Sequence, residues 1–283
     1  MIGTDGGQTG TVLECVMNLS EGRRLELVAE LAGLADGDLL DIHADPHHHR
    51  SVLTLVGTSA VREITRQAVH LLDLSIHEGV HPRLGVVDVV PFVPLPDSTL
   101  DDAVAARDAF AAWAGDELGV PCFLYGPERT LPEVRRRAWH DLPPDTGPGH
   151  THPRAGAICV GARPVLVAYN VWLTGTDAPT ARRIASEVRS PFVRTLGLQV
   201  GDRFQVSMNL VEPDRVGPMA AFDLVAEAAQ HHGGRAEGAE LVGLVPARCL
   251  AVIPRTRWDE LDLAAERTIE WQLAQRNRRT TGT

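Results

Sequence analysis

The chain has 283 residues, 44% of them hydrophobic and 23% charged, which is the composition of an ordinary folded globular protein. This length exceeds what one small core needs, so we expect two packed units. The formal net charge at pH 7 is −10, with histidine counted as neutral. It therefore argues against nucleic acid or an anionic membrane as a partner, because both reward clustered cations.

The four cysteines indicate a reducing compartment. Their spacing matches no zinc or redox pattern and three lie in apolar runs, so we expect free thiols at Cys15, Cys122, Cys159 and Cys249. Segment 1–10 is polar and lacks the apolar core of a signal peptide. The longest apolar segment, 157–173, is interrupted by Arg163 and is too short to span a bilayer. These features predict a cytoplasmic protein.

The first third of the chain alternates strand and helix patterns. Short apolar runs predict strands at 12–17, 39–43, 51–56 and 86–93, and a helical period predicts helices at about 23–35 and at 59–72. This β-α-β-β-α-β order is that of a ferredoxin-like unit. The pattern then predicts a helix at 100–118, a strand at 122–125 and a short helix at 131–139.

Segment 141–156 has no period and holds four prolines and three glycines. A loop of this length inside a compact domain is usually functional or disordered. We favour an ordered binding loop, because two histidines and an arginine lie among its rigid prolines.

The same element order is expected again in the second half. Segments 157–160 and 165–173 resemble a strand pair, followed by a helix at 178–188, a hairpin at 196–200 and 204–211, a helix at 218–231, a strand at 241–245 and a last helix at 258–273. The predicted division is a disordered tail at 1–11, a first subdomain at 12–173, a second at 174–275 and a polar tail at 276–283. The basic runs 135–137 and 276–279 fit a solvated helix face or tail.

A tight turn between the second helix and the strand at 86–93 concentrates ionisable groups. His77 and His81 are four residues apart, and Arg83 follows the second histidine. Pro82 pushes His81 out of the helical region, so covalent geometry alone holds it in an extended or turn conformation. An imidazole that titrates near pH ~6.5 is the natural acid or base at neutral pH. His81 is thus the candidate catalytic group, and Glu21 or Asp88 could orient it.

The run His77-x-Gly79-x-His81-Pro82-Arg83-x-Gly85, with Asp88-Val89-x-Pro91-Phe92 after it, resembles the central motif of glutamate formiminotransferases. Further motifs from about Glu14 to Leu273 extend the resemblance over nearly the whole chain, without the cyclodeaminase domain of animal members. It implies transfer of a formimino group from N-formiminoglutamate to tetrahydrofolate in histidine degradation, with His81 as general acid and base. It also implies two ferredoxin-like α/β subdomains with a cleft or tunnel between them, and a homodimer.

Candidate substrate and folate contacts depend largely on this resemblance. Arginine side chains suit the carboxylates of glutamate and folate, asparagine amides suit the pterin or the substrate amide, and glycines let backbone approach a flat ring. The candidates are Asn18, Glu21, Arg50, His77, Arg83, Gly147, Pro148, Gly156, Ala157, Ile158, Cys159, Val160, Gly161, Ala162, Arg163, Asn170 and Asn209.

Three alternatives remain open. The first is formyl transfer between 5-formyltetrahydrofolate and glutamate, and the second is a folate-binding protein without transfer activity. The third is a metal enzyme that uses the concentration of histidines at 43, 47–49, 77, 81, 150 and 152. Neighbouring histidines of an extended chain cannot all reach one ion, so we expect no metal cofactor and at most adventitious binding at 47–49.

Overall fold

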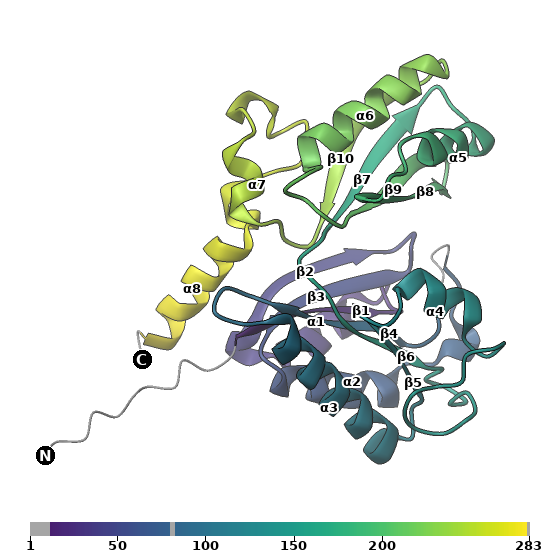
Figure 1. Cartoon of the computed structure of the whole chain (residues 1–283), viewed down its shortest axis with the longest axis vertical. Helices are drawn as coiled ribbons and strands as arrows, with labels where there is room; N and C mark the ends of the chain where they lie inside the picture. Colours follow the sequence, from purple (N-terminus) through teal and green to yellow (C-terminus); the bar gives the residue numbers. More distant parts are fainter. Residues whose placement is uncertain (1–11, 80–82, 282–283) are drawn as a thin grey trace, which may run out of the picture.

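The computed structural model describes residues 12–79 and 83–281, which form two β-sheets with helices on their outer faces (Figure 1). The six-stranded first sheet has the order β2-β3-β1-β4-β6-β5. Its strands are β1 (Leu13–Leu19), β2 (Leu39–Asp45), β3 (Arg50–Val56), β4 (Val87–Pro94), β5 (Cys122–Tyr125) and β6 (Ile158–Ala162). The first four pair antiparallel, whereas β6 runs parallel to both β4 and β5.

Helices cover both sides of this sheet unequally. Three helices bury their apolar stripes against one face, where Leu31, Ile64 and Phe110 join one core: α1 (Leu25–Gly33), α2 (Ser59–Leu71) and α3 (Leu100–Leu118). The short α4 (Leu131–Arg137) covers only the β5 and β6 edge of the other face through Val134. The rest of that face is left to the second half of the chain.

The second sheet has four strands in the order β10-β7-β9-β8. They are β7 (Val167–Thr174), β8 (Val193–Val200), β9 (Arg203–Leu210) and β10 (Arg235–Val242), and the helices α5 (Ala178–Glu187) and α6 (Pro218–His231) cover the outer face. In both halves the first strand of the β-α-β-β-α-β unit lies between the third and the fourth. The two predicted ferredoxin-like subdomains are therefore confirmed.

Three expected elements differ in the structure. β6 and β7 do not pair with each other but belong to different sheets, so the change of sheet falls within 163–166, before the boundary expected after residue 173. β10 begins at Arg235, six residues before the predicted start at 241. Its first residues are polar or small and exposed or only partly buried, so a search for apolar runs does not detect them. The last helix begins at Ile269 rather than at 258. Leu261 and Leu263, which resemble the apolar face of a helix, instead lie in a non-helical segment and pack into the core of the second half.

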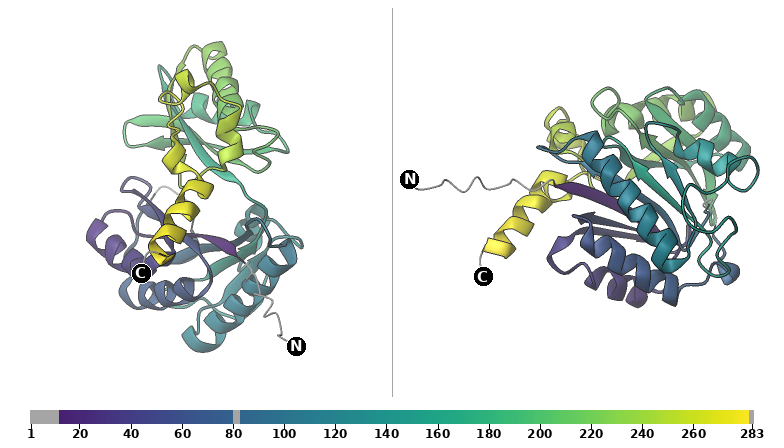
Figure 2. Two further views of the ribbon diagram at one scale, coloured as in Figure 1. Left: turned by 90° about the vertical axis from the view of Figure 1, so that its left-hand side faces the viewer. Right: turned by 60° about the horizontal axis from the view of Figure 1, so that its bottom comes forward.

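The helix α8 (Ile269–Thr281) runs from the second half back along the first sheet (Figure 2). An apolar cluster there joins both halves, with Leu40 and Val56 from the first and Leu244 and Ile269 from the second. Arg276 Nη2 lies 2.6 Å from Asp38 Oδ1. Residues 276–281, predicted as part of a polar tail, form the end of α8, and Arg276 there contacts the first half of the chain, whereas 282–283 lie outside the described residues.

None of the helices in residues 12–79 and 83–281 has both the length and the apolar composition needed to cross a bilayer.

Candidate functional site

Polar side chains gather where β1 ends and where β3 and β4 begin, on the sheet face turned toward the second half. The Asn18 side chain is buried, its Nδ2 donates to the Val16 carbonyl at 2.9 Å, and its Oδ1 accepts a hydrogen bond from Arg50. Burial lowers the pKa of Arg50 to about 10, against the opposing effect of the Asp88 carboxylate. A guanidinium held on a buried amide is suited to an anionic or polar ligand.

Asp88 holds the end of the loop between α2 and β4, residues 72–86, which we call the central loop. Its side chain is 3% exposed, and Oδ2 lies 2.6 Å from Arg135 Nη2 of α4. Oδ1 accepts a hydrogen bond from the Leu84 amide at 2.7 Å. The basic run 135–137 is therefore not wholly a solvated face, because Arg135 is the partner of a buried carboxylate. Asp88 anchors the loop rather than standing free to charge a histidine.

The central loop is held on both flanks of the predicted catalytic position. His77 Nε2 lies 3.0 Å from the His49 carbonyl oxygen, and the two rings stack with centroids 4.1 Å apart. Arg83 donates to the carbonyls of His77 and Gly79, both at 3.1 Å. A Cβ on Gly79 would lie 2.6 Å from the His48 carbonyl oxygen, so glycine is required for this close approach. His81 itself lies outside the described residues.

Glu21 is committed to the start of α1. Its Oε1 accepts hydrogen bonds from the amides of Gly22, Arg23 and Arg24 at 2.9–3.0 Å, and Oε2 lies 2.6 Å from Arg24 Nε. Burial raises the pKa of Glu21, but these bonds outweigh it and leave the pKa below its ordinary value. His49 Nδ1 lies 3.5 Å from Glu21 Oε1, so Glu21 contacts one of the two stacked histidines.

The second sheet contributes from its inward face. Asn170 Nδ2 donates to Glu240 Oε2 at 3.1 Å, and Glu240 Oε1 lies 3.3 Å from His43 Nε2 on the first sheet. Asn209 lies two residues along the facing strand and is exposed. Gln205 is fully buried, and neither of its amide atoms has a hydrogen-bond partner in the described part of the chain. Such a group marks a position that a polar ligand could satisfy.

The segment predicted to bind folate is not gathered in one place. A Cβ on Gly147 would lie 3.0 Å from the Val120 carbonyl oxygen, so this glycine and the adjacent Pro148 lie near the start of β5, whereas Arg163 follows the end of β6. These two parallel strands are in register, so five residues of β6 separate the two places by roughly 16 Å at about 3.3 Å a residue. The intervening side chains are buried in apolar cores: Ala157, Ile158, Cys159, Val160 and Ala162.

Two glycines of this segment have clear structural reasons. Gly156 has φ +75° and forms an isolated bridge with Gly85, where a Cβ would lie 2.2 Å from the Leu84 carbonyl oxygen. A Cβ on Gly161 would lie 2.1 Å from Tyr125 Cζ. The flat ring against Gly161 is thus the protein's own tyrosine.

Sequence reasoning missed a buried carboxylate on β1. Glu14 is 3% exposed, and burial raises its pKa to about 7, opposed by Arg163 and reinforced by Glu270. The available signal was a lone acidic residue at the start of an apolar strand. The sequence also gave no indication that His43 and Glu240 would meet, because they lie on different sheets.

Replacing Glu14 by glutamine should change how stability depends on pH. The native pKa is raised from 4.5 to about 7, so Glu14 stabilises the fold below pH 4.5 and loses this contribution as the pH rises through 7. At about 1.36 kcal/mol per unit the loss is roughly 3 kcal/mol. Urea unfolding from pH 5 to pH 8.5 should show Glu14→Gln gaining on the wild type as the pH rises. A constant difference across this range would contradict the raised pKa.

Among the described residues, the histidines at 47–49 do not belong to the group of three side chains that could jointly hold a metal ion. The amides of His47 and His48 donate to Asp45 Oδ1 at 2.7 and 2.8 Å, whereas His49 Nδ1 accepts a hydrogen bond from the Gly22 amide at 3.2 Å. In the loop at 141–156, His152 Nδ1 accepts hydrogen bonds from the amides of Arg154 and Ala155, so it closes a turn. The rings of His49 and His152 thus accept hydrogen bonds from backbone amides and help to shape their loops.

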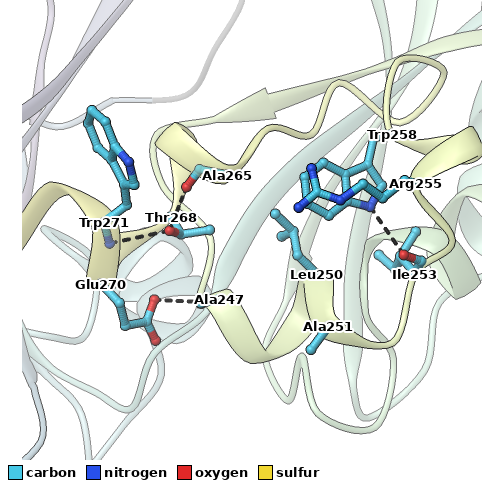
Figure 3. Close-up of a pocket in the computed structure, with 10 residues that line it drawn as sticks. All are labelled: Ala247, Leu250, Ala251, Ile253, Arg255, Trp258, Ala265, Thr268, Glu270 and Trp271. Atoms are coloured by element: carbon cyan, nitrogen blue, oxygen red, sulfur yellow. Dashed lines mark hydrogen bonds between the residues drawn. The ribbon is translucent and has the colours of Figure 1, made fainter.

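A separate pocket of about 600 Å³ lies in the C-terminal segment (Figure 3). Leu250, Ile253 and Trp258 give it an apolar wall, Arg255 lies over the Trp258 ring at 4.3 Å, and Trp271 lines it from α8. It contains none of the predicted site residues, and we assign it no part in the chemistry.

Comparison with known proteins places the chain in a family. The family model for the formiminotransferase domain, N-terminal subdomain, matches residues 12–163. Glutamate formimidoyltransferase of Streptococcus pyogenes serotype M1 is 34% identical over 270 residues, covering 84% of this chain and 90% of that protein. The Thermoplasma acidophilum protein of the same name is 32% identical, with 85% and 90% covered.

Pig (Sus scrofa) formimidoyltransferase-cyclodeaminase is 33% identical over 279 residues, but only 51% of that longer protein is covered. The match is thus to one part of the fused protein. The chain belongs to the formiminotransferase family, in the form that matches glutamate formimidoyltransferases along most of their length.

Proposed function

We propose that this protein transfers a formimino group from N-formiminoglutamate to tetrahydrofolate, as a step of histidine degradation. The secondary amine N5 of tetrahydrofolate attacks the amidine carbon, and a new N5–C bond forms. The bond from that carbon to the glutamate nitrogen then breaks. The proton lost by N5 is matched by the proton gained by the departing nitrogen, so the products are 5-formiminotetrahydrofolate and glutamate.

The observation that carries the proposal, beside family membership, is the clamped central loop. On one side, the His77 ring contacts the His49 carbonyl, and Arg83 donates to the carbonyls of His77 and Gly79. On the other side, the Leu84 amide donates to Asp88. The residues on both sides of position 81 are held by these contacts, and we propose His81 as the group that moves the proton between the two nitrogens. Such a transfer needs an acid and base near neutral pH and no redox step.

The arrangement of cations supports anionic substrates. Arg50 lies on Asn18 at the loop side of the sheet, and Arg163 lies at the opposite end of β6. We propose that Arg50 with Asn18 binds a carboxylate of the amino-acid donor, and that Arg163 serves the folate side. The separation of the two arginines fits two substrates that bind at different places better than one small ligand. The buried amide of Gln205 supplies a further polar group between the sheets.

The setting of the enzyme is part of the proposal. The four cysteines are buried free thiols, which fits a reducing cytoplasm. The family resemblance supports a homodimer, which we propose here and which light scattering on the purified protein would test. Tetrahydrofolate is the co-substrate, and the chemistry of the step asks for no metal.

A transfer assay tests the function directly. Chelator-treated protein is mixed with tetrahydrofolate and N-formiminoglutamate, and glutamate release is followed with and without the folate. Release that requires both substrates supports the proposal. Release only from N-formylglutamate would replace formimino by formyl transfer. Folate binding without any release would leave a binding protein and sink the transferase.

A further inference from the structure

Three potential metal ligands meet on the outer layer of the second subdomain, on the side of the sheet away from the proposed transfer site. Glu187 is the last residue of α5, His231 is the last residue of α6, and His232 follows it. Together they form the one group of three such ligands found within residues 12–79 and 83–281. The histidines at 47–49, which the sequence favoured for metal binding, do not contribute.

The ligand atoms of this cluster already point toward one another. His232 Nε2 lies 2.9 Å from Glu187 Oε2, and His231 Nδ1 lies 3.9 Å from Glu187 Oε1. One nitrogen of each ring and a carboxylate oxygen all lie within 4.8 Å of one another. A tetrahedral zinc ion with bonds of about 2.0–2.1 Å separates its ligands by roughly 3.3 Å. Small side-chain rotations are therefore enough to place all three around one ion.

The backbone adds to the attraction for a cation. α5 has 10 residues and α6 has 14, and both end at this cluster. Helix C-termini carry partial negative charge, which favours a cation within the last turn. Two imidazoles and one carboxylate also form the donor set that borderline divalent ions prefer, because imidazole suits zinc, copper and nickel.

We propose that Glu187, His231 and His232 form a binding site for one divalent ion of the zinc class, with water in the fourth position. The bound ion ties the end of α5 to the end of α6. The site takes no part in group transfer, because both helices cover the outer face of the second sheet. The inference is therefore independent of the proposed reaction.

Equilibrium dialysis of chelator-treated, tag-free protein against zinc chloride tests this site, with thermal unfolding in parallel. One ion per chain should bind and raise the melting temperature. Glu187→Gln, His231→Gln and His232→Gln should each weaken binding by roughly tenfold or more, since even outer-shell changes cost roughly 10- to 100-fold. Matched controls are Glu227→Gln on α6, and His140→Gln and His150→Gln in the first half, all of them exposed.

Two results would overturn the proposal. A triple variant carries Glu187→Gln, His231→Gln and His232→Gln together. If the wild type binds zinc no more tightly than this triple variant, these residues hold no ion. Tight binding that persists in the triple variant and disappears in a His47→Gln variant would move the site to the histidine run. The residues lie on the surface at helix ends, so circular dichroism should show that every variant folds.

Discussion

Replacing His81 by glutamine should lower kcat for glutamate release by about 10²- to 10⁴-fold, the usual contribution of a positioned general acid and base. Glutamine preserves size and hydrogen bonding but cannot exchange a proton near neutral pH. The flanking residues His77, Arg83 and Leu84 make hydrogen bonds of their own, which the substitution leaves unchanged. We therefore expect KM to change much less than kcat.

The matched control is His140→Gln, which changes an exposed histidine just after α4 and should leave kcat within about twofold. His77→Gln is informative as well, because His77 supports the loop through its ring and its carbonyl. It should raise KM together with a partial loss of kcat. Equal kcat for wild type and His81→Gln would remove His81 from the chemistry, even if the transferase assay itself succeeds.

Replacing Asp88 by alanine should lower the free energy of unfolding by about 3–5 kcal/mol, the usual cost of removing one partner of a buried ion pair. The carboxylate is 3% exposed and lies 2.6 Å from Arg135. Its loss leaves Arg135 without its anion and the Leu84 amide without its acceptor. Urea unfolding measures the change, and activity should fall too, because Leu84 closes the central loop.

The double variant Asp88→Ala/Arg135→Met should recover part of this stability, because it removes the uncompensated charge. Asp141→Ala is the matched control, since its pair with Arg137 is 3.1 Å long and exposed on both sides. That change should cost no more than about 1 kcal/mol. If Asp88→Ala behaves like Asp141→Ala, Asp88 does not anchor the loop.

Most of the fold was predictable because its elements carry strong local signals. α3 begins with a Thr99–Asp102 capping box and ends at Gly119 in the left-handed region, so both predicted ends were correct. Pro218 likewise marks the first turn of α6. The predicted pairing of the two strands on either side of 161–164 was wrong, because β6 and β7 lie in different sheets. Gly and Pro residues occur both in a turn within one sheet and in a link between two sheets. Only pairing partners distinguish them, and pairing is not local.

Part of the candidate site was predictable, because some of its residues are ionisable side chains in or beside tight loops. His77, Arg83 and Arg50 stand out by residue type, and the structure brings all three to one end of the first sheet. Sequence analysis did not select Arg135, Glu240 or Glu14. The role of an arginine in a basic run, or of an acid in a strand, depends on the residue that it contacts in the fold, and the sequence does not show that contact. Glu21 was assigned to ligand binding, yet its oxygens are engaged by the start of α1.

The docking of α8 has a kinetic consequence. Arg276 and Asp38 are 238 residues apart in sequence, whereas each sheet has a hydrophobic core of its own. Closing so long a loop is slow compared with forming local pairs. We therefore expect each half to acquire its sheet before the two are joined. On refolding, secondary structure should return before the contact between His43 and Glu240 forms, and transfer activity should return last.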